Sequence, residues 1–215
     1  MSFYDFLVLP FVEIEIRLGT ILKNKFDPSI DKKYFEKIKE SLELSTWKNI
    51  VNINTVEYIN NEQSQNSARN INIKLITDIT GKENKSKLMM KENISTEDFQ
   101  LSSSPFDIRY SINQEFKIDS QINSFSKNNS VIRNKTRKSF IQENFRYDLT
   151  IVNENIDGVT KSKYEIEIEL LVNETTLNWD KLYVNEFLEC KIYDLVNIVE
   201  PIQRDKFKIN LIKIK

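Results

Sequence analysis

Histidine is missing from this 215-residue sequence, and cysteine occurs once, at Cys190. Without histidine the chain cannot carry Ser-His-Asp or Cys-His catalysis, nor a histidine-ligated zinc or haem site. A single cysteine excludes an intrachain disulfide framework and a cysteine-rich metal site. No apolar run approaches the roughly 18 residues of a membrane span, and the apolar segment 1–11 contains Asp5 and lacks the basic region of a signal peptide. We therefore expect an intracellular protein with no membrane partner.

A charge excess of either sign is also missing. The 31 Lys+Arg and 32 Asp+Glu residues leave a net charge of −1, which gives no support to sequence-independent binding of DNA. The hydrophobic content of 40%, with 13 Phe and 8 Tyr, is enough to build a core. No internal repeat and no convincing linker divides the chain, so we expect one domain over residues 1–215.

Alternation of apolar and polar residues dominates the chain and predicts a mainly β protein. Gly81 and Gly158 fall where hairpin turns need a positive φ. A weaker ninth strand is expected over 207–214, after eight clear ones. The eight clear strands span 11–22, 50–59, 69–79, 85–92, 106–118, 130–138, 145–153 and 163–172.

Two segments have the spacing of helices instead. The first follows Asp27 and has apolar residues at 34, 35, 38 and 42. The second runs from about residue 179 to 199 and is closed by Pro201. Its apolar positions include Leu182 and Cys190, and we expect Cys190 to be a small core residue. The polar segments 60–67 and 120–129 are predicted loops.

One face of several predicted strands is charged. In segment 163–172, Glu165, Glu167 and Glu169 alternate with apolar residues such as Ile166 and Ile168. A solvated sheet face would explain any one such strand, but three like charges on one face repel each other in water. A closed barrel with a charged interior would bring acidic and basic faces together around an ionic ligand, with the isoleucines pointing outward.

The residue types indicate what such an interior would bind. Oxygen ligands without His or Cys favour Mg²⁺ or Mn²⁺. Arg133, Lys135 and Arg137 alternate on one face of segment 130–138, and such cations suit phosphate oxygens. Acids for a metal together with bases for phosphates indicate metal-assisted hydrolysis of a phosphoanhydride.

Five segments carry a family resemblance. The sequence Glu-Ile-Glu-Ile-Arg-Leu-Gly at 13–19 resembles the first metal-binding strand of the tunnel-type, metal-dependent RNA 5′-triphosphatases of mRNA capping, in the triphosphate tunnel metalloenzyme superfamily. Segments 107–115, 133–137, 146–150 and 165–169 are similar to that family's later motifs and come in the same order. The resemblance covers about residues 11–172. The bias toward Ile, Asn and Lys resembles a giant-virus member, as the N-terminal module of a larger capping enzyme.

The resemblance implies an α+β fold built on a closed eight-stranded antiparallel β-barrel, with a charged tunnel inside and helices packed on the outside. It implies that Glu13, Glu15 and Glu169 ligate Mg²⁺ or Mn²⁺. Lys135 and Arg137 would hold the γ-phosphate. Supporting groups, or contacts to the other phosphates, would come from Arg17, Arg109, Arg133, Arg146, Asp148 and Thr150, with Arg17 and Arg109 beside the carboxylates.

Two further assignments follow from the resemblance. Glu115, with help from Glu165 or Glu167, would orient or deprotonate the attacking water. The family also has a Lys and an Arg facing the phosphates on the hairpin within 69–92. Lys91 matches the Lys. For the Arg, we favour Arg69, which has the right chemistry if the strand contains a bulge; Lys74, on the more polar face, is the alternative.

The implied reaction is hydrolysis of the γ-phosphate at the 5′-triphosphate end of nascent RNA, the first step of cap formation. An RNA guanylyltransferase, fused or separate, is the expected partner, because the lysine motif of nucleotidyltransferases is missing here. The expected location is a viral factory or virion, or the nucleus of a cell. Alternatives are a triphosphatase acting on inorganic triphosphate, thiamine triphosphate or nucleotides, which the Arg-Leu-Gly ending disfavours, and a catalytically silent polyanion-binding barrel.

Overall fold

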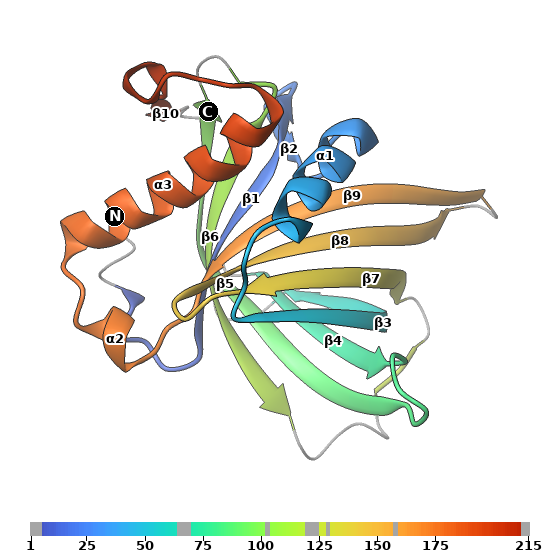
Figure 1. Cartoon of the computed structure of the whole chain (residues 1–215). Coiled ribbons are helices and arrows are strands. Elements are labelled where there is room, and N and C mark those ends of the chain that lie inside the picture. Colours follow the sequence, from blue (N-terminus) through green and yellow to red (C-terminus); the bar gives the residue numbers. More distant parts are fainter. Residues whose placement is uncertain are drawn as a thin grey trace.

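The structure is a computed structural model of the chain and describes residues 6–63, 70–101, 104–118, 125–127, 130–156 and 159–211. Its strands belong to one sheet that curls into a barrel, with helices on one side (Figure 1). The strands are β1 (Val12–Leu22), β2 (Lys25–Asp27), β3 (Asn49–Gln63), β4 (Asn70–Asp78), β5 (Lys85–Leu101), β6 (Asp107–Ile118), β7 (Val131–Ile141), β8 (Phe145–Ile156), β9 (Val159–Leu170) and β10 (Ile209–Leu211). The helices are α1 (Lys32–Glu43), α2 (Glu174–Leu177), α3 (Lys181–Val199) and the 3-10 turn η3 (Arg204–Lys206).

Eight of the strands close into a ring. Starting at β5, the order is β5-β4-β3-β7-β8-β9-β1-β6, and β6 pairs again with β5. Every pairing in the ring is antiparallel. β2 and β10 lie outside the ring, on β1 and β5. The predicted closed eight-stranded antiparallel barrel is confirmed.

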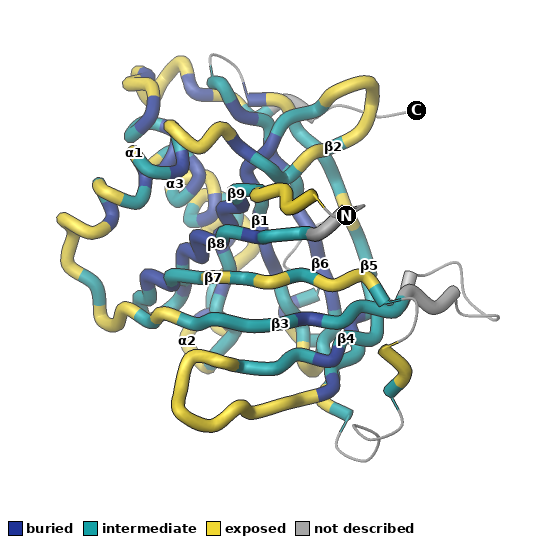
Figure 2. Tube along the Cα trace, turned by 90° about the vertical axis from the view of Figure 1, so that its right-hand side faces the viewer, coloured by how far each residue is buried: buried dark blue, intermediate teal, exposed yellow. Residues whose placement is uncertain are grey.

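The barrel buries its apolar residues on the outside. Ile14, Ile16, Ile166 and Ile168 are all 0% exposed and belong to one core with the inner faces of α1 and α3. Figure 2 shows the buried stretches gathered on the strands beneath these helices, whereas β3 and β7 are mostly intermediate or exposed. Because neighbouring strand residues point to opposite faces, the alternating glutamates point into the barrel, as predicted.

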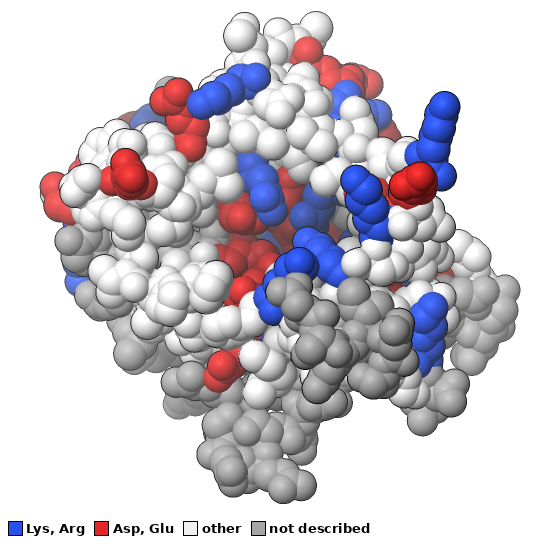
Figure 3. All heavy atoms as spheres, turned by 90° about the horizontal axis from the view of Figure 1, so that it is seen from below, with Lys and Arg blue, Asp and Glu red and all other residues white. Residues whose placement is uncertain are grey.

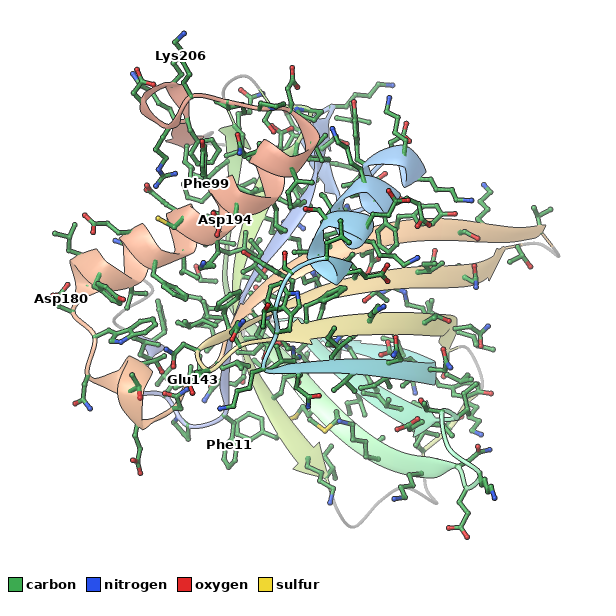
Figure 4. The ribbon with its side chains drawn as sticks, in the orientation of Figure 1. Phe11, Phe99, Glu143, Asp180, Asp194 and Lys206 are labelled. Carbon is green, nitrogen blue, oxygen red and sulfur yellow. The ribbon has the colours of Figure 1, made fainter. Side chains whose placement is uncertain are left out.

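Capped helix starts fix the outer layer. The Asp31 side chain accepts a hydrogen bond from the Lys33 backbone N–H at the start of α1 (2.9 Å). Asp180, labelled in Figure 4, accepts one from the Tyr183 N–H at the start of α3 (2.8 Å). Such caps satisfy N–H groups that have no partner within the helix.

Phe99 of β5, also labelled in Figure 4, packs edge-on against Tyr110 of β6 at 5.1 Å between ring centroids.

We expect Ile166→Ala to destabilise the protein by about 2–5 kcal/mol, as a large-to-small change in a dry core. Its side chain is fully buried in the outer layer, so the loss appears as a lower free energy of unfolding in urea. Val159→Ala on the same strand is the matched control, because Val159 is 59% exposed and a surface change costs within about 0.5 kcal/mol. Equal stability of the two variants would contradict the outward orientation of Ile166.

The second helix differs from its prediction. α3 begins at Lys181, Leu182 is 66% exposed, and Cys190 is exposed rather than a core residue. The expectation for Cys190 is wrong because another stripe of α3 faces the barrel. That buried stripe consists of Val184, Leu188, Ile192, Leu195, Val196 and Val199. The short helix α2 and strand β2 were not predicted.

Several strand ends also differ. β5 continues to Leu101 rather than ending at residue 92, through a register shift between Asn93 and Ser95. β3 continues to Gln63, so the loop predicted from residue 60 begins too early. A turn containing Gly81 does connect β4 and β5, but Gly81 does not have the expected positive φ. Gly158 lies outside the described residues. Of the weak strand 207–214 only Ile209–Leu211 is found, and 212–215 lie outside the described part.

None of the helices in the described residues has the length and apolar character to cross a membrane.

Candidate active site: a charged tunnel

The inside of the barrel is hollow and lined with charge. A first cavity of about 490 Å³ is lined by residues from all eight barrel strands. A second, of about 580 Å³, is lined by β3, β4, β5, β7 and β8. Lys135 borders both cavities. Figure 3 looks into this hollow from below and shows acidic and basic side chains gathered within it.

The predicted metal ligands come together across two neighbouring strands. Glu15 of β1 lies directly opposite Glu169 of β9, and Glu13 lies two residues before Glu15 on the same face. Burial raises the pKa of Glu169 to about 8, and although Arg146 opposes this, the charges of Glu13 and Glu15 add to it. A divalent cation would relieve that repulsion, so this oxygen-only donor set fits a hard metal ion. Among the described residues, no three such side chains are already in metal-binding geometry.

Lys91 of β5 instead lies among these acids. Its ammonium contacts Glu13 and lies 3.7 Å from Glu15 and 3.3 Å from Glu115. Burial lowers the pKa of Lys91, but Glu15, Glu13 and Glu115 outweigh it and hold that pKa well above its ordinary value. Asn113 adds hydrogen bonds to Glu13 (3.1 Å) and Glu15 (3.4 Å). Lys91 is thus in the tunnel, as predicted, but bound to carboxylates.

Arg17 and Arg109 have different partners. Arg17 binds Glu15 at 2.9 Å and Glu167 at 2.8 Å, so it lies beside the carboxylates as predicted. Arg109 is paired through both its Nε (2.6 Å) and Nη2 (2.8 Å) with Asp98, outside the five motifs. Its guanidinium also lies 4.7 Å from the ring of Phe26 on β2.

Gly19, which ends the first motif, has a packing reason for its identity. A Cβ added there would meet the backbone oxygen of Asp27 and the ring of Phe26 on β2. Strand β2 can therefore cross this point only over a glycine.

Arg137 is the best-fixed cation of the tunnel. Its Nε donates to Thr150 Oγ1, its Nη1 to Asp148 and its Nη2 to Glu167, each at 3.0 Å. Asp148 is 0% exposed and also accepts from Ser139 (2.5 Å) and Arg146 (2.9 Å). Burial raises the pKa of Glu167, but the charges of Arg17 and Arg137 hold it well below its ordinary value. Glu167 therefore stays ionised as an anchor for two arginines.

The other basic residues have acidic partners too. Arg133 binds Glu165 at 2.6 Å and Glu154 at 3.0 Å, and Arg146 binds Glu169 at 2.5 Å. Lys135 lies 2.9 Å from Glu57 of β3.

Three acids of this network were missed in the sequence: Glu57, Asp98 and Glu154. Glu57 is a lone acid between Thr55 and Ile59 on its face, so no charged pattern marks it. Asp98 and Glu154 lie beyond the ends of the predicted strands 85–92 and 145–153. Longer predicted strands would have been needed to place them on the inner face.

Lys74 and Arg69 were the alternatives for the remaining phosphate contact. Arg69 lies outside the described residues. Lys74 lines the first cavity, and no carboxylate of the described residues is within ion-pair distance of it. Burial, together with the charges of Lys91 and Lys135, lowers the pKa of Lys74 to about 8. Lys74 is therefore a buried cation available for an anionic ligand.

A closed antiparallel barrel with opposed acids and bases inside, and its apolar residues outside, defines a tunnel-type enzyme for phosphoanhydride substrates. The sequence profile of the family "mRNA capping enzyme, beta chain" matches residues 12–205. The chain therefore belongs to this family of mRNA triphosphatases, which are hydrolases of phosphoanhydride bonds.

Solved structures agree on the fold. The S. pombe Pct1 RNA triphosphatase, in complex with the Spt5 CTD, has a TM-score of 0.69 at 15% identity, over 94% of this chain and 91% of that one. The RNA triphosphatase domain of a trifunctional mimivirus mRNA capping enzyme has a TM-score of 0.60 at 16% identity, over 92% and 95%. No curated protein matches the sequence significantly.

Proposed function

We propose that this RNA triphosphatase depends on Mg²⁺ or Mn²⁺, held by Glu13, Glu15 and Glu169. The observation that carries the proposal is the crowding of these like-charged carboxylates in the same tunnel as Lys135 and Arg137. When bound, the ion neutralises phosphate charge and polarises a phosphoryl oxygen. The products are an RNA 5′-diphosphate end and phosphate.

The cations bind and orient the substrate. Lys135 and Arg137 hold the γ-phosphate, with the planar fork of Arg137 oriented by Asp148 and Glu167. Lys74 is available to the other phosphate oxygens, and Arg133, Arg146 and Lys91 would reach them by exchanging carboxylate partners for phosphate. Such preorganised charges stabilise a transition state whose negative charge is spread over the transferring group.

Glu115 is the group that orients or deprotonates the attacking water, with help from Glu165. Its side chain is 33% exposed, so a water can reach it. Glu167 is a poorer base because each of its oxygens binds an arginine and its pKa lies far below the ordinary range. Its role is to position Arg17 and Arg137.

Release of γ-labelled phosphate from 5′-triphosphate RNA tests the function. We expect turnover with Mg²⁺ or Mn²⁺ and none with EDTA. Hydrolysis of inorganic triphosphate or ATP without hydrolysis of RNA ends would favour another branch of the superfamily. Binding of triphosphate RNA without any turnover would indicate a silent polyanion-binding barrel.

Lys74 predicts a pH dependence of phosphate affinity. Below pH 8 its ammonium is charged and attracts inorganic triphosphate, and above pH 8 it is neutral. We expect wild type to bind inorganic triphosphate about tenfold more tightly than Lys74→Met at low pH. This difference in affinity, measured by calorimetry, should vanish as the pH rises. The variant corrects for titration of the ligand itself. Lys117→Met on β6 serves as a further basic-residue control, and a pH-independent Lys74 effect would contradict the assignment.

We also propose the context of the enzyme. Residues 1–215 form one tunnel domain that acts with an RNA guanylyltransferase, fused or separate, because the chain has no nucleotidyltransferase lysine motif of its own. Its composition supports a giant-virus origin, with action in the viral factory or virion. A cellular enzyme would act in the nucleus.

A further inference from the structure

The two halves of the tunnel have different walls. Inward positions around the first cavity are mostly charged or amide-bearing, with only Ile59 and Val131 aliphatic. Around the second cavity four aliphatic side chains face inward, each only partly buried. This aliphatic wall consists of Val51, Ile53, Ile76 and Ile141.

The aliphatic wall adjoins the cations proposed for the γ-phosphate. Ile53 of β3 lies directly opposite Arg137 of β7, and Ile76 of β4 lies opposite Glu57, the partner of Lys135. Ile14, Ile16, Ile166 and Ile168, by contrast, face outward into the core. Apolar surface left in water costs about 25 cal/mol per Å², so a wall of this kind favours a ligand with apolar surface. Phosphates alone would not need it.

The rim of the second cavity is basic. Lys85 and Lys87, at the start of β5, are exposed and line the cavity; the acids at this end are Asp78, which also lines it, and Glu83 and Glu143 in the adjoining turns. This end of the barrel carries the turns 79–84 and 142–144. Exposed lysines at such an opening attract the backbone phosphates of a nucleic acid.

We propose that RNA enters the tunnel at this end and that the aliphatic wall is the subsite of the 5′-terminal nucleoside. This proposal rests on the proposed function. The 5′ end of RNA joins a flat base to a triphosphate on one side and to anionic backbone on the other. The cavity offers a partner for each part of that end: exposed Lys85 and Lys87 for the backbone, the aliphatic wall for the base, and Arg137 and Lys135 for the phosphates, with Arg137 directly opposite Ile53 of the wall. The triphosphate then lies toward Lys135, which borders both cavities.

Substitutions in the aliphatic wall should lower activity on triphosphate RNA more than activity on inorganic triphosphate. For Ile53→Thr and Ile76→Thr, we expect the ratio of kcat/KM for triphosphate RNA to kcat/KM for inorganic triphosphate to fall about tenfold. The matched control is Ile59→Thr, an inward aliphatic residue of the same strand β3 that borders the first cavity. Its ratio should stay at the wild-type value. Thermal unfolding checks that all three variants are folded.

Photocrosslinking locates the nucleoside directly. RNA with a photoreactive base at its 5′ end and a non-hydrolysable triphosphate should attach to segments 49–55, 76–78, 85–87 or 139–141. Attachment near residues 59, 131–133 or 154 would place the RNA at the opposite end and overturn the proposal, as would a ratio changed only by Ile59→Thr. If wild type hydrolyses RNA ends but neither Ile53→Thr nor Ile76→Thr changes the ratio of kcat/KM values, the subsite is wrong and the proposed function still holds. Absence of RNA hydrolysis by wild type would instead defeat the function.

Discussion

Replacing Glu15 with alanine is expected to lower kcat for phosphate release by about a thousandfold or more, because a lost metal ion removes several kcal/mol of charge stabilisation. Glu15 lies opposite Glu169 and also binds Arg17 at 2.9 Å. Its removal therefore takes away one metal ligand and one of the two carboxylate partners of Arg17. Saturating Mg²⁺ should not restore the rate.

Binding of Mn²⁺, followed by calorimetry without RNA, gives a readout independent of turnover. Glu15→Ala should bind Mn²⁺ far more weakly than wild type. Glu43→Ala is the control, since Glu43 pairs with Lys138 outside the tunnel. Near-normal turnover by Glu15→Ala at saturating Mg²⁺ would show that Glu15 is not a ligand.

The inverted barrel could be predicted from the sequence because strand periodicity is local. Glu165, Glu167 and Glu169 alternate with Ile166 and Ile168, and no twist or tilt can turn neighbours to the same face. The charged set then had to face inward once the apolar set had helices to pack against. The same reasoning holds for Glu13 and Glu15.

The ion-pair partners could not be predicted, because they depend on register between strands far apart in sequence. Lys91 reaches Glu115 since the two lie opposite each other on β5 and β6. The register shift between Asn93 and Ser95 then changes which residues face inward, so that Asp98, an even-numbered position, meets Arg109. A simple alternation breaks at that shift, which is why β5 seemed to end at residue 92.

Which face of α3 is buried also could not be predicted from the sequence. Apolar residues occur all around this helix, so spacing alone does not select the buried stripe. Contact with the barrel selects Val184 and Leu188 and leaves Leu182 and Cys190 exposed.

Arg137→Lys is expected to lower kcat/KM for triphosphate RNA by about a hundredfold, although the charge is kept. Three nitrogens of Arg137 are fixed at 3.0 Å by Thr150, Asp148 and Glu167, and a lysine ammonium cannot contact all three and also bind a phosphate through a planar fork. Asp148, fully buried, would lose a donor. The neighbouring Lys138→Arg is the control, since Lys138 faces outward to Glu43 and should leave kcat/KM unchanged. Full activity of Arg137→Lys would show that Arg137 acts only through its charge.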